Sequence, residues 1–297
     1  MDEDGFREHR FPATDGLQLY ARSYPPARPT AALPVICLPG LTRNSRDFHE
    51  LANFLASPSG GGHTVFSFDY RGRGGSARDA DKSHYSIAVE TNDIITACAH
   101  LDIDRAVFIG TSRGGLILHH LVGVAPGLIA GTVLNDIGPV IEIHGLLAIR
   151  DYLNKEPSEA ISWVTAPGYL KNLHGADFPF LSDREWLQMA RAIYRDQDDV
   201  PVPDFDPAIA HQLLGLTAET PLPALWLQFD ALSQMPLLGI RGQYSRVLSE
   251  ATLQEMSSRH PDMAEFTALG QGHAPLLHLD GSRQAIASFL SGYALGR

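Results

Sequence analysis

The sequence predicts an α/β fold in which a mostly parallel central sheet is flanked by helices and carries an inserted helical cap. Short apolar runs alternate with segments of helical periodicity, which is typical of parallel strands joined by crossover helices. This alternation stops at about residue 139, where stretches rich in Trp, Tyr, Pro and Asp begin, and it resumes after residue 223. A chain of 297 residues is long enough for one domain with a sizeable insertion.

We expect residues 1–138 and 224–297 to form one core domain, because neither part makes a complete layer on its own. Residues 139–223 are expected to form the cap. The expected strands and helices follow from apolar runs and from helical spacing. The strands are 6–12 and 17–24, which resemble a hairpin turned at Asp15-Gly16, and then 34–38, 64–68, 106–110, 128–134, 236–241 and 265–269. The helices are 47–56, 86–100 and 112–124 in the core, 161–164 and 184–195 in the cap, and 282–295 at the end.

Composition excludes several classes of protein. A hydrophobic content of 44% with 19% charged residues is globular rather than disordered. The formal net charge is −11 and no basic stripe is present, so nucleic-acid binding is not expected. The polar N-terminus lacks the apolar core of a signal peptide, and no apolar run is long enough to span a membrane. A cytoplasmic protein with no membrane partner is therefore expected, with Cys37 and Cys98 as small buried side chains rather than a disulfide.

Residues 110–114, GTSRG, match the pattern G-x-S-x-G. The pattern alone is weak, but here a buried strand leads into it and a helix leads out. A sharp turn in this setting lifts the serine to the edge of the sheet, and the glycines remove side chains that would collide in the turn. The helix N-terminus that follows favours developing negative charge. Ser112 is therefore the predicted nucleophile.

A serine hydroxyl is a poor nucleophile at neutral pH and needs a base within hydrogen-bond reach. His273 lies in a glycine-rich loop after the last expected strand, in residues 269–273, LGQGH. Its place late in the chain, after the serine, makes His273 the predicted base. His278 is expected to have a structural role near the last helix.

Backbone amides that could hold an oxyanion are expected at two places. The loop after strand 34–38 supplies one N–H, assigned to Leu41 with Thr42 as its neighbour, and Arg113 after the serine supplies the other. Residues 69–76, DYRGRGGS, lack the spacing of a phosphate-binding loop and are expected to form a tight loop whose Asp and Arg hold neighbouring backbone. No histidine pair has metal-ligand spacing, so no metal or organic cofactor is expected.

Five segments resemble, in this order, the α/β-hydrolase superfamily: LPGLTRNSRDF, FDYRGRGGS, FIGTSRGG, LNDIGP and GQGHAP. They are most similar to its capped bacterial esterase and lactonase-like members. The resemblance implies the α/β-hydrolase fold and hydrolysis of a small carboxylic ester or lactone through an acyl-enzyme on Ser112. It does not define the substrate, because this fold carries many chemistries.

The acid that should orient His273 is not at its usual place. Most relatives carry an Asp in the loop after strand 236–241, and the resemblance places Arg246 there, which cannot accept a hydrogen bond. We favour Asp136 in LNDIGP, because some members carry the acid at the end of the strand that follows the elbow helix. Two alternatives stay open: Glu250, displaced along the same loop, or loss of the acid. Asp136 could also simply cap backbone N–H groups before the cap.

Other functions fit parts of the pattern. Ser112 excludes the carboxylate nucleophile of haloalkane dehalogenases and epoxide hydrolases. The same serine and histidine could hydrolyse the carbon–carbon bond of a β-diketone-like substrate, and the Arg246 departure also fits a non-catalytic small-molecule receptor. Arg246, if it points into the cleft, would pair with a substrate carboxylate. Aromatic residues of the cap suit a largely apolar pocket: Tyr152, Trp163, Tyr169, Phe178, Phe180, Trp186 and Tyr194.

Overall fold

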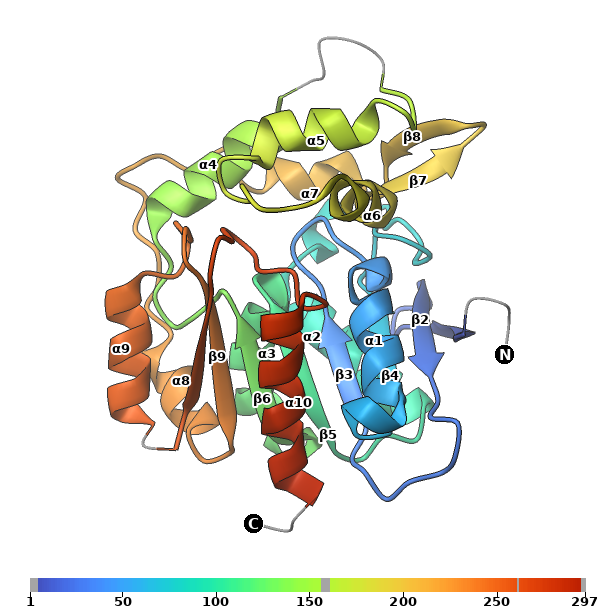
Figure 1. Cartoon of the computed structure of the whole chain (residues 1–297), viewed down its shortest axis with the longest axis vertical. Helices are drawn as coiled ribbons and strands as arrows, with labels where there is room; N and C mark the ends of the chain where they lie inside the picture. The colour runs from blue at the N-terminus through green and yellow to red at the C-terminus, as the bar shows by residue number, and fades with distance from the viewer. Residues whose placement is uncertain (1–4, 156–160, 261, 295–297) are drawn as a thin grey trace.

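The computed structural model describes residues 5–155, 161–260 and 262–294, and it confirms the predicted fold class (Figure 1). An eight-stranded sheet runs in the order β1-β2-β4-β3-β5-β6-β9-β10. β2 pairs antiparallel with β1 and with β4, and the other neighbouring strands are parallel. The strands are β1 (Arg7–Pro12), β2 (Gln18–Tyr24), β3 (Val35–Leu38), β4 (Val65–Asp69), β5 (Ala106–Thr111), β6 (Ile129–Asn135), β9 (Leu237–Gly242) and β10 (Ala264–Ala268).

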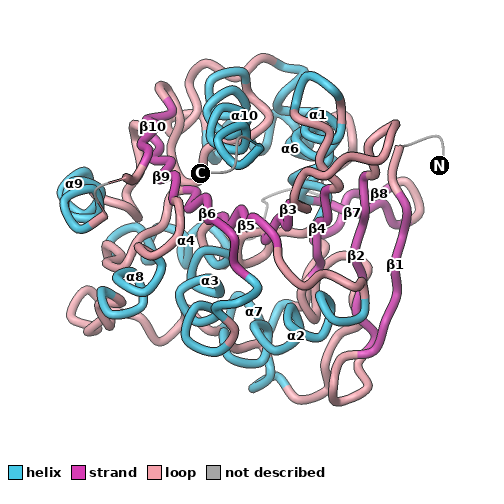
Figure 2. Tube along the Cα trace, turned by 90° about the horizontal axis from the view of Figure 1, so that it is seen from below, coloured by secondary structure: helices cyan, strands magenta, loops and turns pink. Residues whose placement is uncertain are grey.

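Helices cover both faces of this sheet, as Figure 2 shows. α1 (His49–Ala56) and α10 (Asp280–Ala294) lie on one face. On the other lie α2 (Ile87–His100), α3 (Arg113–Val124) and α8 (Trp226–Leu232), and α9 (Glu250–Arg259) packs its apolar side into the same core. Two hydrophobic cores result, one for each face.

β5 shows why the strands read as continuous apolar runs. Successive side chains of a strand point to opposite faces, and a strand covered on both faces buries all of them. Phe108 enters the core under α2 and α3, whereas Val107 and Ile109 enter the core under α1 and α10. The two free cysteines are buried as predicted, Cys37 in the second of these cores and Cys98 in the first.

The segment between β6 and α8 leaves the sheet and forms a layer above it (Figure 1). It contains α4 (Ile143–Leu153), α5 (Ala166–His174), α6 (Asp183–Ile193), β7 (Tyr194–Gln197), β8 (Val200–Pro203) and α7 (Pro207–His211). Trp186, Leu170 and Phe178 pack together in a small core of its own. This segment, called the cap below, corresponds to the predicted insertion, and the boundaries at 139 and 223 stay a prediction. Residues 1–4, 156–160, 261 and 295–297 of the predicted ranges lie outside the described residues.

The structure corrects two elements expected in the cap. Residues 161–164 are not a helix: α5 begins at Ala166, and Pro167 stands in its first turn, where a missing N–H costs nothing. The helix expected at 184–195 ends at Ile193, because the backbone becomes extended at Tyr194 and enters the two-stranded sheet β7-β8. In the described parts of the chain no helix is long and apolar enough to cross a membrane.

Candidate active site

Ser112 stands at the turn from β5 into α3, in the conformation that the motif predicted. Its φ of 50° and ψ of −108° lie outside the usual regions for a residue with a side chain. A Cβ on Gly114 would come within 2.2 Å of the Leu38 carbonyl oxygen, and one on Gly110 within 2.7 Å of the Gly114 backbone. The motif therefore needs both glycines for close backbone approach. The Ser112 side chain does not cap α3, which leaves its hydroxyl for another partner.

The predicted base contacts this hydroxyl, and one predicted acid contacts the base. His273 Nε2 lies 2.9 Å from Ser112 Oγ, and His273 Nδ1 lies 2.8 Å from Asp136 Oδ2. A carboxylate oxygen can only accept, so Nδ1 carries the proton and Ser112 donates to Nε2. The three side chains thus form one continuous chain of hydrogen bonds.

Asp136 is held firmly in this position. It follows β6 directly, is fully buried, and adopts a φ of 56°. Its N–H donates to the Ile240 carbonyl at 2.7 Å, and its second carboxylate oxygen accepts the Gly242 N–H at 2.8 Å. The backbone of β9 therefore positions the carboxylate that faces His273.

The other positions considered for the acid lie elsewhere. Glu250 is exposed in the first turn of α9, where a negative charge favours the helix N-terminus. Arg246 is exposed on the loop after β9, and its Nη2 lies 3.1 Å from Asp177 Oδ2 in the cap. Of the two carboxylates predicted for this role, Asp136 and Glu250, the structure brings only Asp136 into contact with the imidazole.

The two amides predicted for an oxyanion belong to a residue of the pocket lining and to the residue that follows the serine. Leu41 and Ser112 line the same pocket, and Arg113 follows the serine in sequence. Within the described chain, the backbone N–H groups of Leu41, Thr42 and Arg113 have no hydrogen-bond acceptor. They are therefore available to an oxygen bound in the pocket.

A buried ion-pair network supports this region. Glu90 is fully buried, and its two oxygens accept from Arg73 Nη1 at 2.6 Å and from Arg113 Nε at 2.5 Å. Arg73 Nε also donates to the Leu41 carbonyl at 2.9 Å. One carboxylate on α2 thus connects both segments that offer free amides. This agrees with the prediction that residues 69–76 hold neighbouring backbone.

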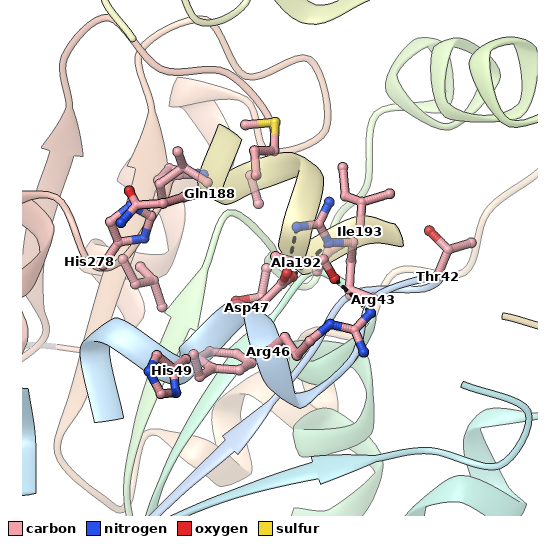
Figure 3. A pocket seen from close by; sticks show the side chains of 18 of the residues that line it. Thr42, Arg43, Arg46, Asp47, His49, Gln188, Ala192, Ile193 and His278 are labelled. Carbon is pink, nitrogen blue, oxygen red and sulfur yellow. Dashed lines mark hydrogen bonds and ion pairs between the residues drawn. The ribbon is translucent and has the colours of Figure 1, made fainter. Parts of the chain in front are cut away.

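A pocket of about 630 Å³ lies between the cap and the ends of the core strands. Core loops contribute Leu41, Ser112 and His273, and the cap contributes Ile149 and Met189. Figure 3 shows part of the lining from close by. Since Leu41, Ser112 and His273 come after β3, β5 and β10, the cap covers the carboxyl ends of these strands.

Only two of the predicted cap aromatics, Tyr152 and Phe178, line this pocket. Trp186 and Tyr194 are buried in the core of the cap, Trp163 and Tyr169 pack against it, and Phe180 is 79% exposed. Arg43, His174 and His278 line the pocket without having been predicted to, and His278 had been expected in a structural role. Helical spacing does not show which face of a cap helix meets the site, so the sequence carried no signal for His174 or for the choice among the cap aromatics.

Burial shifts the pKa of several ionisable groups of the lining, among them His174 and Tyr152. It lowers the pKa of His174 to about 4, with the positive charge of Arg43 acting in the same direction. It raises the pKa of the Tyr152 phenol, against the opposing effect of Arg43. Both side chains are therefore uncharged at neutral pH.

One cluster outside the pocket has ligand types that suit a metal ion. The ligand atoms of Asp15, Asp79 and His84 lie within 4.8 Å of one another. Arg71 donates to both aspartates, at 2.9 Å and 2.5 Å, so its guanidinium already compensates their charge. We treat this cluster as an ion-pair network.

Comparisons with known proteins agree with the fold described above. A family model described as alpha/beta hydrolase fold matches residues 34–277. The 3-hydroxybutyrate-oligomer hydrolase of Cupriavidus necator is 30% identical over 269 residues, covering 88% of each protein. Esterase YbfF of Escherichia coli is 24% identical over 249 residues, 81% of this chain and 85% of the relative.

A solved structure is similar over nearly the whole chain. The alpha/beta hydrolase from Novosphingobium aromaticivorans has a TM-score of 0.87 and 35% sequence identity, and the match covers 97% of this chain and 98% of that one. The family model, the Cupriavidus relative and the fold with its serine elbow lead to the same result. The protein belongs to the alpha/beta hydrolase fold family.

Proposed function

We propose that the protein hydrolyses carboxylic esters through an acyl-enzyme on Ser112. The observation that carries this proposal is the continuous chain of hydrogen bonds from Ser112 through His273 to Asp136. A nucleophile, a base and an acid that orients the base are the parts that acyl transfer needs. In this proposal they come from the loops after β5, β10 and β6.

Acylation begins when Ser112 Oγ attacks the ester carbonyl carbon and its proton passes to His273 Nε2. The carbonyl oxygen becomes an oxyanion, which the backbone N–H groups of Leu41 and Arg113 stabilise. Asp136 holds the ring orientation and stabilises the imidazolium. The tetrahedral intermediate then collapses, and His273 gives its proton to the departing alcohol.

Deacylation repeats these steps with water. His273 removes a proton from a water molecule, whose oxygen attacks the acyl carbon of the Ser112 ester. The second tetrahedral intermediate uses the same two amides, and its collapse returns the proton to Ser112 Oγ. The products are a carboxylic acid and an alcohol, and a lactone would follow the same route to a hydroxy acid.

The names of the relatives support ester chemistry. One is called an esterase, and the other is called a hydrolase of 3-hydroxybutyrate oligomers. Linear oligoesters of short hydroxy acids are therefore the substrates that we would test first. A pocket of about 630 Å³ is within the size range of small-molecule sites.

The proposal is tested with a short-chain p-nitrophenyl ester and the Ser112→Ala variant. We expect the variant to lose kcat by a factor on the order of 10⁶, because the nucleophile is absent. Wild-type protein should also react with a fluorophosphonate at Ser112, as seen by intact mass. Full activity of the variant would contradict the assignment.

The two other functions give different results in the same experiment. A receptor without an activated serine would neither turn over the ester nor be labelled. A carbon–carbon hydrolase would be labelled but would cleave a β-diketone in preference to the ester.

A further inference from the structure

The pocket has a charge balance opposite to that of the whole protein. Among the residues that the structure describes, four arginines line it (Arg22, Arg43, Arg46 and Arg191), but only two carboxylates do (Asp47 and Glu50). The formal net charge of the chain is −11. A concave site with low-dielectric walls concentrates the field of the charges around it. An excess of guanidinium groups therefore favours entry of an anion.

The guanidinium groups of two of these arginines already bind other protein groups. Arg22 donates to the Tyr20 hydroxyl, and its guanidinium stacks over the Phe6 ring. Arg46 forms an ion pair with Asp204 at 2.7 Å and donates to cap carbonyls. Arg191 is exposed.

Arg43 is placed differently from the other three. It lies two residues beyond Leu41, in the loop that offers the free amides. Asp47 binds one edge of its guanidinium, with Nε–Oδ2 at 2.7 Å and Nη2–Oδ1 at 2.5 Å. Figure 3 shows the two side chains joined in the pocket, with Ile193 of the cap next to them. This contact orients Arg43 and leaves Nη1 without an acceptor among the described residues.

The cap brings two more polar groups to the lining near Arg43. Tyr152 and His174 pack edge to face, with ring centroids 5.0 Å apart, and the charge of Arg43 acts on both. The Tyr152 hydroxyl and the His174 ring nitrogens have no hydrogen-bond partner in the part of the chain that the structure describes. Each can donate a hydrogen bond, since both are uncharged at neutral pH.

We propose that this site selects esters that also carry a free carboxylate, and that Arg43 binds the carboxylate with Tyr152 and His174 beside it. The proposal rests on the proposed ester hydrolysis and adds the substrate class. A guanidinium suits this role because its planar N–H groups match the geometry of a carboxylate. Ile149, Met189 and Ile193 provide apolar lining for a short aliphatic chain between the ester and the carboxylate.

Turnover is compared on two matched substrates, mono-p-nitrophenyl adipate and the same ester with its free acid converted to a primary amide. The six-carbon chain avoids the rapid self-cleavage to a cyclic anhydride that shorter diacids undergo. We expect wild-type kcat/KM to favour the acid about 10- to 100-fold, the range for a hydrogen bond to a charged group. No preference for the acid would overturn the proposal.

The double variant Arg43→Gln/Asp47→Asn separates directed binding from general attraction. It replaces an ion pair by two neutral amides, so the net charge of the pocket stays the same while the guanidinium is lost. We expect the acid-to-amide ratio to fall to about one. Arg191→Gln removes one positive charge from the same pocket and should keep most of the ratio. An equal loss in both variants would show a general field effect and would overturn the role of Arg43.

A binding measurement keeps this proposal separate from the proposed function. Monoethyl adipate and its primary amide are titrated into the Ser112→Ala protein by calorimetry, which needs no turnover. We expect the acid to bind about 10- to 100-fold more tightly, and Arg43→Lys to retain part of this difference, because Lys keeps the charge but loses the planar fork. Turnover of the amide ester without a binding preference refutes carboxylate selection alone. A binding preference without any ester turnover refutes the proposed function alone.

Discussion

At the scale of single residues, the surroundings of Asp136 differ from those of Arg246, which occupies the loop position where the resemblance places the usual acid. Asp136 is buried, held by the backbone of β9, and faces His273 at 2.8 Å. Arg246 is exposed and pairs with Asp177 of the cap. The loop after β9 therefore forms an ion pair with the cap, while the carboxylate that contacts His273 comes from the residue after β6.

We predict that Asp136→Asn lowers kcat on an ester about 10⁴-fold, because the amide no longer fixes the tautomer of His273 or stabilises its positive charge. The measurement is steady-state kinetics on a p-nitrophenyl ester, with circular dichroism to check folding. Glu250→Gln is the matched control, since it also removes one carboxylate, and it should keep wild-type rates. If the two variants had equal rates, Asp136 would not be the acid.

The residues of the candidate site could not all be predicted equally well from the sequence. Ser112 and His273 could be located because each follows a strand in a glycine-containing motif. Asp136 stayed one of three alternatives, since sequence spacing does not show which loop of the sheet edge reaches the imidazole. Arg43 was missed although it follows Leu41 closely, because its role depends on Asp47 and on cap residues more than 100 positions away.

At the scale of elements, the inner strands β3, β4, β5, β6 and β9 could be predicted to within one or two residues, because burial on both faces leaves an uninterrupted apolar run. The hairpin β7-β8 could not. Its turn places Asp198 and Asp199 at φ values of 54° and 63°, which suits a two-residue hairpin turn. Glycine or asparagine would have marked such a turn, and an Asp pair reads equally well as exposed loop.

Helix α2 carries Glu90, whose carboxylate binds Arg73 and Arg113 next to the candidate site. We predict that Glu90→Gln lowers the free energy of unfolding by about 3–5 kcal/mol, because Arg73 and Arg113 would be left buried without a counter-charge. Urea unfolding measures this change.

Glu255→Gln is the matched control for that substitution. It breaks an exposed ion pair with Arg259 on α9 and should leave the free energy of unfolding nearly unchanged. If both variants lost the same unfolding free energy, the buried Glu90 network would stabilise the fold no more than an exposed ion pair does.

At the scale of the whole molecule, ion pairs fasten the cap to the core at several points. Arg46 pairs with Asp204 at 2.7 Å, and Lys82 pairs with Asp206 at 2.5 Å. Asp206 also accepts a hydrogen bond from the Tyr85 hydroxyl at 2.8 Å. The cap and the core, which enclose the pocket, are therefore held together by ion pairs as well as by apolar contacts.

Acid should destabilise the fold through buried histidines. Burial lowers the pKa of His119 to about 4 from an ordinary value of 6.5, against a hydrogen bond from Nδ1–H to the Gly115 carbonyl. Between these values the unfolded chain binds a proton that the folded chain does not, so stability is lost as pH falls from about 6.5 towards 4.

We predict that His119→Leu reduces this loss. Between pH 7.5 and pH 5 the wild-type protein should lose about 2 kcal/mol more unfolding free energy than the variant, because the variant lacks the titrating ring. Urea unfolding at the two pH values measures the difference, and equal pH dependence in the two proteins would contradict the role of His119.

The two free, buried cysteines can report local unfolding of the protein. Burial raises the pKa of Cys98 to about 12 and shifts the pKa of Cys37 in the same direction, so neither thiol reacts as a thiolate in the folded state. Cys37 belongs to the core under α1 and α10, and Cys98 to the core under α2 and α3. The alkylation rates of Cys37 and Cys98 would therefore measure how often each of the two cores opens. The experiment needs no engineered cysteine.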